Sequence, residues 1–305
     1  MATIEIYTDD TKCNRNTFRI IVVIWGEKEN CDSYKKDIQY LVNANIKVLG
    51  KDFKGFHSYN LNEKNWKTVG KAYEQVLDYF IESVKNKKLH FFIRLESEDV
   101  YNANAGYLKN LAKVNLEKRE SDFGKIFKKL SDKDLPAFYH RADQLFIFLR
   151  YRDKFGSSEN NFILYPDSSG KILRYDGTTF EVSGDIFKEY PIEFYDLIKI
   201  WCNSLTKIIK AEEWPSGEQR LDKFCPLKSS GDYIIQTCDI ISNFFFNFLR
   251  NQVGILDPKA VLKTNALCKI IDFSQHSGII KSSFIKKEDE VICSVKGLKV
   301  YIDFV

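Results

Sequence analysis

Three aspartates stand where an α/β protein commonly exposes functional side chains. Asp9 and Asp10 follow the alternating polar and apolar run of residues 3–8, and Asp167 follows the apolar run of residues 161–165. Both runs predict strands, and strand ends are frequent sites of functional groups in α/β sheets. A turn is the plainer interpretation of all three, because Asp side chains accept hydrogen bonds from nearby backbone amides.

A fourth aspartate, Asp239, lies inside the most apolar helix pattern of the chain, residues 233–249. Helical spacing places it in one narrow polar stripe. The stripe consists of Asp232, Gln236, Asp239, Asn243, Asn247 and Arg250. It is either the solvent face of an amphipathic helix or the wall of a polar cleft. The solvent face is the more common case, but a chain rich in Lys and Glu would be expected to use those residues there. Short amides around one carboxylate suit a cleft wall instead, so the two interpretations are evenly balanced.

His57 is the histidine whose surroundings suggest chemistry. It stands in a Gly-Phe-His-Ser-Tyr segment between two helix patterns, and an imidazole there could transfer a proton or contact a phosphate near neutral pH. A lone histidine in a loop is more often structural. His90, His140 and His276 have no partner at zinc-ligand spacing, and the common hydrolase, nucleotide-phosphatase and dinucleotide motifs are missing from the sequence.

The elements that would position these residues alternate between strand and helix. Apolar runs predict strands, and steps of three and four predict helices. The strands are expected over residues 3–8, 18–25, 90–95 and 161–165, and the helices over residues 32–42, 62–84 and 233–249. This alternation predicts an α/β sheet flanked by helices.

Two further parts are expected to extend this domain. Residues 103–155 have a mainly helical period, and within them residues 109–133 contain eight Lys or Arg against four Asp or Glu, a local net charge of +4. Such a face is usually only solvated, but it could also contact phosphates. After residue 257 the pattern changes to short β-like runs. We therefore expect a main domain over residues 1–257, with a helical insertion at about 103–155, and a small C-terminal appendage over 258–305.

Composition narrows the class of protein. A chain of 305 residues with 44% hydrophobic residues can bury a large core, and a net charge of +4 is too small to indicate a nucleic-acid binder by itself. Seven scattered cysteines without a C-x-x-C pair predict reduced thiols. No secretory signal or apolar run of about 20 residues is present. We expect a soluble, cytoplasmic protein with no membrane partner.

Four short motifs together resemble a widespread, largely uncharacterised bacterial family. Residues 7–11, Tyr-Thr-Asp-Asp-Thr, are similar to its Tyr-Ile-Asp-Glu-Ser start, and Phe56 and His57 are similar to its Phe/Ile-His motif. Residues 164–167 are similar to its strand ending in aspartate, and residues 235–241 to its late Leu-Gln-Leu-Ala-Asp-Leu-Ile helix. The family has a ribonuclease H-like fold, an unknown function, and frequent association with defence and mobile elements. The resemblance covers about residues 3–250.

This resemblance implies a metal-dependent nuclease. It implies that Asp9, Asp167 and Asp239 are ligands of Mg²⁺ or Mn²⁺, with Asp10 as an auxiliary ligand and His57 in proton transfer or phosphate contact. Two such ions about 4 Å apart would assist phosphodiester hydrolysis. The basic residues at 109–133 would then approach the backbone of the nucleic acid.

Two other classes of function remain open. The altered motifs and the mild charge favour a non-catalytic module that binds nucleic acid, or a protein encoded in the same operon, and has lost its metals. A phosphohydrolase of small nucleotides would need a closed pocket where a nuclease needs an open groove. The sequence does not separate DNA from RNA as the partner.

Overall fold

The structure is a computed structural model in which the chain forms two units. Unit 1 consists of Met1–Ile4 and Asp99–Lys228, and unit 2 of Glu5–Glu98 and Ser229–Val305. The residues that the structure describes are 1–11, 18–57, 60–61, 65–97, 144, 147–148, 151–157, 159–167, 173–175, 178–180, 221–224, 227–252, 271–272, 291–295 and 298–304.

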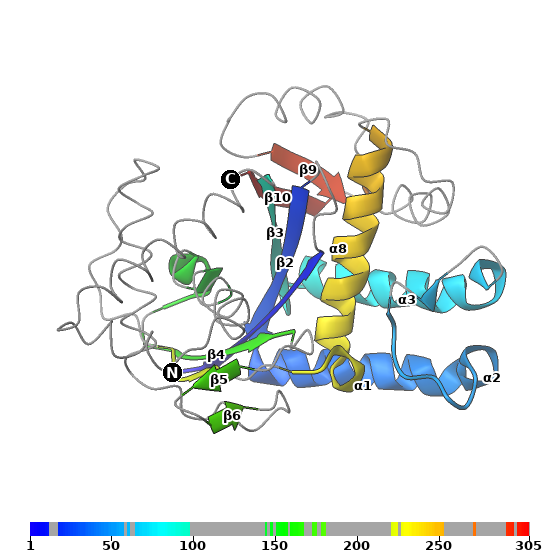
Figure 1. The fold of residues 1–305 in the computed structure, drawn as a ribbon, viewed down its shortest axis with the longest axis horizontal. Helices are drawn as coiled ribbons and strands as arrows, with labels where there is room; N and C mark the ends of the chain where they lie inside the picture. Colours follow the sequence, from blue (N-terminus) through cyan, green and yellow to red (C-terminus); the bar gives the residue numbers. More distant parts are fainter. Residues whose placement is uncertain are drawn as a thin grey trace. The chain divides into compact units, whose positions relative to one another are not determined.

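Unit 2 is built on a mixed sheet (Figure 1). Its strands lie in the order β1 (Thr3–Thr11), β2 (Phe18–Glu27), β3 (His90–Ser97), β10 (Leu298–Phe304), β9 (Val291–Val295) and β8 (Ile271–Asp272). β2 and β3 are antiparallel, with Ile24 opposite Phe91, whereas β3 and β10 are parallel, with Ile93 opposite Ile302. β9 is antiparallel to both β10 and β8. Strands of both directions therefore share one sheet.

The apolar run in β2 forms the centre of the core. Residues 20–24, Ile-Ile-Val-Val-Ile, are each at most 1% exposed. Because successive side chains of a strand point to opposite faces, both faces of β2 are shielded from solvent. A nearly continuous run of β-branched residues is the pattern that such a strand requires.

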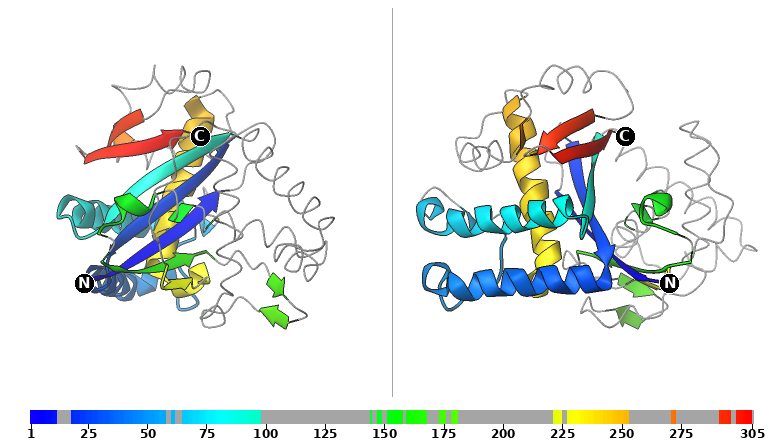
Figure 2. Two further views of the ribbon diagram at one scale, coloured as in Figure 1. Left: turned by 90° about the vertical axis from the view of Figure 1, so that its left-hand side faces the viewer. Right: turned by 180° about the vertical axis from the view of Figure 1, so that it is seen from behind.

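Three long helices pack on one face of this sheet. They are α1 (Lys28–Ala44), α3 (Trp66–Lys85) and α8 (Tyr233–Gln252), with a short α2 (Ile46–Leu49) after α1. α1 and α3 lie side by side and α8 runs across them (Figures 1 and 2). The Phe80 ring of α3 lies 6.4 Å from the Tyr34 ring of α1 and 5.1 Å from the Phe91 ring of β3. The helices therefore cover the face of the sheet that carries Phe91.

Unit 1 contains a smaller set of described elements. They are η2 (Arg152–Lys154), β4 (Asn161–Pro166), β5 (Leu173–Tyr175), β6 (Thr178–Phe180) and β7 (Lys223–Phe224). β4 and β7 are parallel, and β5 and β6 are antiparallel. The Arg152 guanidinium lies 3.8 Å from the centre of the Phe162 ring, and Phe148 lies between Phe155 and Phe162 in an aromatic cluster. This cluster is the apolar centre of the described part of unit 1.

The α/β class and most of the expected elements are confirmed. The helix expected over residues 32–42 is α1, that over 62–84 is α3 and that over 233–249 is α8, each within a few residues of its expected bounds. β1 runs through Asp9 and Asp10 to Thr11, so these aspartates lie within the strand. Most of residues 103–155, including the basic stretch at 109–133, lie outside the described residues.

The C-terminal strands join the sheet at a strand from the first hundred residues of the chain. β9 and β10 are strands, as the β-like runs predicted, but they belong to unit 2 and extend its sheet through the parallel pairing of β10 with β3. The physical reason is that β3 would otherwise leave a row of backbone donors and acceptors at a sheet edge. A local pattern predicts that a segment is a strand, whereas its partner is set by contacts with distant residues.

Among the helices that the structure describes, none is long and apolar enough to cross a bilayer.

Candidate functional site

Asp9 and Asp10 point to opposite faces of β1, because side chains alternate along a strand. Arg19 of β2 donates from Nε to Oδ2 of Asp10 at 2.7 Å, and the two side chains are only 4% and 11% exposed. Asp9 is 8% exposed, and its Oδ1 accepts the backbone N–H of Asp10 at 2.7 Å. Asp9 shares its face with Glu5 and Tyr7, as the alternation of the sequence predicted. Asp10 is held on the other face by a buried ion pair.

The segment that carries His57 is held by a glutamine from α8. The Gln236 side chain is 2% exposed, its Oε1 accepts the N–H of Phe56 at 2.8 Å, and its Nε2 donates to the carbonyl of Ser229 at 2.7 Å. The amide lies across Gly55, where a Cβ would stand 2.6 Å from Nε2 of Gln236. Gly55 also has a φ of +123°, which L side chains rarely adopt. Glycine is therefore required for this contact.

The same segment is fixed from the side of α3. The hydroxyl of Tyr73 donates to the carbonyl of His57 at 2.9 Å, and the Tyr73 ring packs edge-on against Phe56 at 5.0 Å. Phe56 is fully buried and His57 is 5% exposed. Two elements that lie far apart in the sequence, α3 and α8, thus determine where the imidazole lies.

His57 and Asp239 form a close pair. Nδ1 of His57 lies 3.8 Å from Oδ2 of Asp239, within ion-pair range but too long for a direct hydrogen bond. The side chains are 6% and 17% exposed. Nδ2 of Asn243 donates to Oδ1 of Asp239 at 2.7 Å, which fixes the orientation of the carboxylate. The pair is therefore held on both sides and only partly open to solvent.

The polar stripe of α8 is not a solvent face where its side chains are described. Asp232 is 7% and Gln236 2% exposed, Asp239 is partly buried, and Asn243 contacts Asp239. The solvent-face interpretation is therefore wrong for these four positions. Each polar side chain has hydrogen-bond or ion-pair partners that offset the desolvation cost of its burial. This explains why short amides and aspartates stand there instead of Lys and Glu. The side chains of Asn247 and Arg250 lie outside the described residues.

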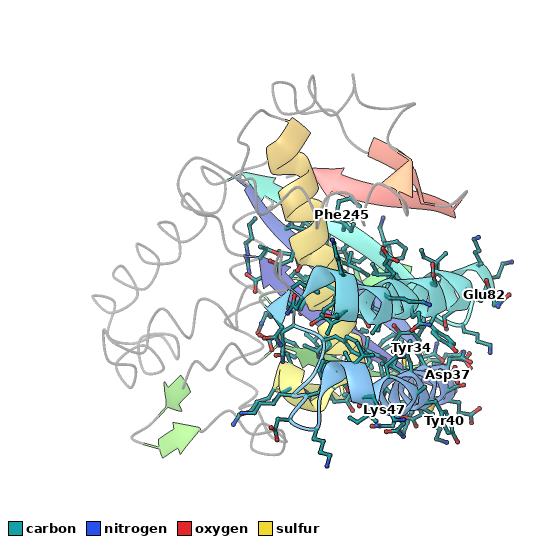
Figure 3. All side chains as sticks on the ribbon, turned by 90° about the vertical axis from the view of Figure 1, so that its right-hand side faces the viewer. Tyr34, Asp37, Tyr40, Lys47, Glu82 and Phe245 are labelled. Carbon is teal, nitrogen blue, oxygen red and sulfur yellow. The ribbon has the colours of Figure 1, made fainter. Side chains whose placement is uncertain are left out.

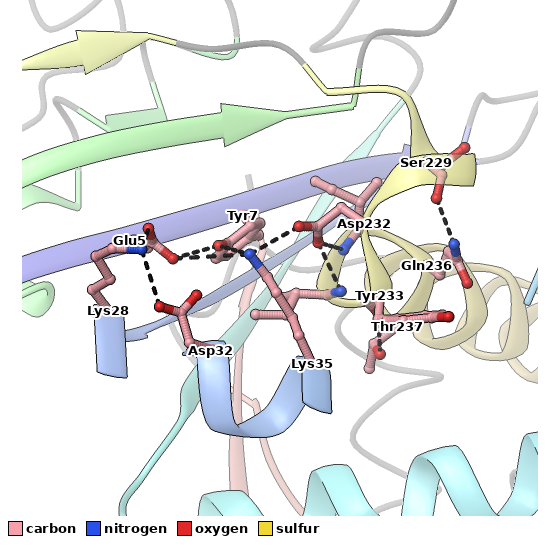
Figure 4. Close-up of polar contacts among 12 residues, drawn as sticks. Glu5, Tyr7, Lys28, Asp32, Lys35, Ser229, Asp232, Tyr233, Gln236 and Thr237 are labelled. Atoms are coloured by element: carbon pink, nitrogen blue, oxygen red, sulfur yellow. Dashed lines mark hydrogen bonds and ion pairs between the residues drawn. The ribbon is translucent and has the colours of Figure 1, made fainter. Parts of the chain in front are cut away.

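A buried charge network fixes the N-terminus of α8 (Figure 4). Nζ of Lys35 donates to the Tyr7 hydroxyl at 2.6 Å and lies 2.9 Å from Oδ2 of Asp232. The Tyr7 hydroxyl donates to Oε2 of Glu5 at 2.6 Å. Oδ1 of Asp232 accepts the N–H groups of Ile234 and Ile235 at 2.8 and 3.1 Å, which is the geometry of a helix N-cap. One lysine thus joins β1, α1 and α8.

Burial keeps Tyr7 in its neutral form. The side chain is fully buried, and loss of water around it, followed by the negative charges of Asp232 and Glu5, raises the pKa of its hydroxyl far above the ordinary value. The neutral phenol can donate to Glu5 and accept from Lys35 at the same time. Tyr7 therefore links Lys35 of α1 to β1 by hydrogen bonds.

α8 also contacts β1 close to Asp9. The Cys238 thiol lies 3.8 Å from the carbonyl oxygen of Tyr7, two residues before Asp9, and Asp239 follows Cys238 directly. β1 and α8 therefore bring Asp9 and Asp239 to the same side of the sheet in unit 2. Asp167 belongs to unit 1, where it follows β4 in a parallel bridge with Leu227, and its carbonyl accepts Nε2 of Gln144 at 3.3 Å.

The carboxylates near His57 are the candidate donors for a metal ion. Among the residues that the structure describes, no group of three or more His, Cys, Asp or Glu side chains lies close enough to hold a metal ion. The carboxylate oxygens of Asp9 and Asp239 are the type of donor that a hard divalent cation prefers. Mg²⁺ in proteins is often held by one or two carboxylates, with water and substrate phosphate as its other ligands. Oδ2 of Asp10 is engaged by Nε of Arg19 at 2.7 Å.

Several positioning residues were not singled out by the sequence patterns. Lys35 and Tyr73 are the clearest examples, because nothing local links them to His57 or Asp239. Gly55 lies in the same segment as His57, but nothing in that segment indicates its contact with Gln236. Arg19 gave one usable signal: it interrupts the most apolar run of the chain, and a charged residue buried in a strand requires a partner of opposite charge.

The fold and site of unit 2 define an α/β protein with a mixed sheet, covered by helices, that carries a buried His–Asp pair. Comparison with family models, curated proteins and solved structures found no match to this chain.

Proposed function

We propose that this protein hydrolyses phosphodiester bonds of nucleic acid in a metal-dependent reaction on a ribonuclease H-like fold. The observation that carries the proposal is the His57–Asp239 pair, 3.8 Å between Nδ1 and Oδ2, built by residues separated by most of unit 2. An imidazole beside a carboxylate is suited to phosphodiester hydrolysis because this reaction requires proton transfer near neutral pH.

His57 would act on the reacting phosphate or on the attacking water. The Asp239 carboxylate lies beside Nδ1 of His57, and from this position His57 would donate a proton to a leaving oxygen or contact a phosphate oxygen. The 3.8 Å separation is consistent with this role, because catalytic contacts are often long without substrate and tighten when it binds.

Asp9 and Asp239 would hold Mg²⁺ or Mn²⁺. Their oxygens are the donors that these hard cations prefer, and both lie on the helix-covered side of the sheet. A bound ion supplies activation of water and stabilisation of the developing charge on phosphate oxygens. Asn243 keeps the Asp239 carboxylate oriented through its 2.7 Å hydrogen bond. The expectation for Asp167 depends on the sequence resemblance alone.

The test is cleavage of labelled single- and double-stranded DNA and RNA with Mg²⁺ or Mn²⁺. We expect metal-dependent cutting that Asp239→Asn abolishes and that His57→Gln lowers by about 10²- to 10⁴-fold, the usual contribution of a positioned acid or base. Asp78→Asn, the same change at an exposed carboxylate of α3, serves as the control and should cut normally. Adding small nucleotides to the substrate panel tests the phosphohydrolase alternative.

One observation favours a second candidate, a non-catalytic module that binds nucleic acid or protein. The buried Arg19 ion pair commits Asp10, the second acidic residue of the opening motif, to a structural role. In that case no substrate would be cut with either metal, and calorimetry would detect no Mg²⁺ or Mn²⁺ binding that Asp239→Asn removes.

A further inference from the structure

A short exposed segment next to the candidate site is rich in lysine. Residues 47–54, Lys-Val-Leu-Gly-Lys-Asp-Phe-Lys, follow the start of α2 and contain exposed Lys47, Lys51 and Lys54 and one exposed carboxylate, Asp52. Within the part of the chain that the structure describes, none of the three ammonium groups forms an ion pair. Figure 3 shows Lys47 on the same side of the helices as Tyr40 and away from Phe245 of α8. The segment is therefore a positively charged, solvated surface.

This segment leads directly into the residues that hold His57. Lys54 immediately precedes Gly55, which packs against Gln236, and His57 follows two residues later. A chain extends by at most about 3.6 Å per residue, so the Cα atoms of Lys54 and His57 are no more than about 11 Å apart. That span corresponds to about three base-pair steps along the axis of a duplex, at about 3.4 Å each.

We propose that Lys51 and Lys54 bind the phosphate backbone of a nucleic-acid strand close to His57, with Lys47 extending the same track. The inference rests on the proposed function for the choice of nucleic acid as the partner. Lysines recognise phosphates as point charges, so this contact supplies affinity and position without sequence preference. Phe53, which precedes Lys54, packs against Phe56 at 4.8 Å and keeps the segment joined to the site.

A nucleic acid fits this segment better than a membrane surface. α2 has four residues, and its exposed apolar side chains, Ile46 at 38% and Val48 at 49%, are each still partly covered. A membrane-bound amphipathic helix needs a much larger apolar face. Lys51 and Lys54 lie close together in the sequence and just before His57, for which we propose a phosphate contact. Their spacing suits the repeated phosphates of a nucleic-acid strand.

The size of the effect follows from counterion release. Each lost phosphate contact lowers the slope of log K against log salt by about 0.7 for a single strand. At 0.1 M salt this is about a 5-fold loss of affinity per contact, and about 25-fold for two contacts. The double variant Lys51→Gln, Lys54→Gln should therefore lower the salt slope by about 1.4.

The test measures anisotropy of labelled oligonucleotides in EDTA, from 50 to 400 mM salt, with the full chain. A matched control, Lys85→Gln, Lys88→Gln, removes the same charge from exposed lysines at the far end of α3. A 25-fold loss and a lower slope in the first variant alone support the inference. Equal losses in both variants, no loss in either, or binding of phosphatidylserine vesicles that depends on Lys51 and Lys54 without nucleic-acid binding would overturn it.

The outcome separates this inference from the proposed function, because binding is measured without metal. If Lys51 and Lys54 are required for binding but no condition gives cutting, the binding track stands and the hydrolase proposal fails. If cutting depends on Asp239 while the lysine variant binds and cuts normally, the hydrolase proposal stands and the binding track fails.

Discussion

The contact between Gly55 and Gln236 gives the sharpest quantitative prediction for Gly55→Ala. The new Cβ would stand 2.6 Å from Nε2, 2.8 Å from Cδ and 2.9 Å from Oε1 of Gln236, so the amide must move. Gln236 is 2% exposed and bonded at both ends of its amide, so movement takes the partner from the buried N–H of Phe56. The substitution therefore acts on the backbone and on Gln236 together.

The magnitude has two parts. A non-glycine residue at a φ of +123° costs about 1–3 kcal/mol of strain. Loss of a partner for a buried N–H costs about another 1–3 kcal/mol. We expect Gly55→Ala to lower the free energy of unfolding by about 2–6 kcal/mol.

Gly50→Ala is the matched control. Gly50 has a φ of +89°, but no atom lies within 4 Å of the position that a Cβ would take there, so only the strain remains. We expect it to cost about 1–3 kcal/mol, less than Gly55→Ala by the cost of displacing Gln236. Urea unfolding monitored by circular dichroism, with equal m values for the two variants, gives this difference directly.

A double-mutant cycle with Gln236→Ala tests the contact itself. In that background the amide is gone, so adding Gly55→Ala should cost only the strain, and the two substitutions should be less than additive by about 1–3 kcal/mol. Additive effects, or a Gly55→Ala cost no larger than that of Gly50→Ala, would refute the claim that Gln236 holds the His57 segment through Gly55.

Three further predictions concern the buried charges. Asp232→Ala should lower the free energy of unfolding by about 0.5–2 kcal/mol through loss of the N-cap of α8. The loss of the partner of Lys35 should add to this cost. Asp232→Asn keeps a capping oxygen and should cost less in the same urea titration. Because the pKa of Tyr7 is raised in the folded protein, the unfolded chain loses this proton first, above about pH 10. The free energy of unfolding is therefore retained below that pH and falls above it by up to about 1.4 kcal/mol per pH unit. Tyr7→Phe should reduce this fall in unfolding measured between about pH 9 and 11.5. Arg19→Met should lower the free energy of unfolding by about 3–5 kcal/mol, because it removes the cation that faces Asp10. Adding Asp10→Ala should recover part of that loss in thermal unfolding. No recovery in the double variant would contradict the pairing.

Local patterns were sufficient for the elements and for part of the site. The β-branched run of β2 predicted a buried strand, and the apolar steps of α3 and α8 predicted their helices, because burial imposes these periods on the sequence. Strand alternation also placed Asp9 with Glu5 and Tyr7. Asp239 stood out because short amides surround one carboxylate in an otherwise apolar helix, but the sequence left a solvent face and a cleft wall evenly balanced.

The partners themselves could not be predicted from the sequence. The link between Phe56 and Gln236 joins residues 180 positions apart, and the link between Tyr7 and Cys238 joins residues 231 positions apart. Such pairs depend on helix rotation and strand order, which no short motif encodes. The pairing of β10 with β3 is of the same kind, because it joins strands about 200 positions apart in the sequence.

The polar residues of α8 act as a set because a helix is rigid along its axis. Asp232, Gln236, Asp239 and Asn243 follow one another at steps of four, three and four residues, so they share a face. The rotation that lets Asp232 meet Lys35 is therefore the rotation that lets Gln236 hold Phe56 and Asp239 face His57. A rotation by one residue, about 100°, would break all three contacts together. The charge network at the N-terminus of α8 thus helps to fix the rotation of the helix on which the His57–Asp239 pair depends.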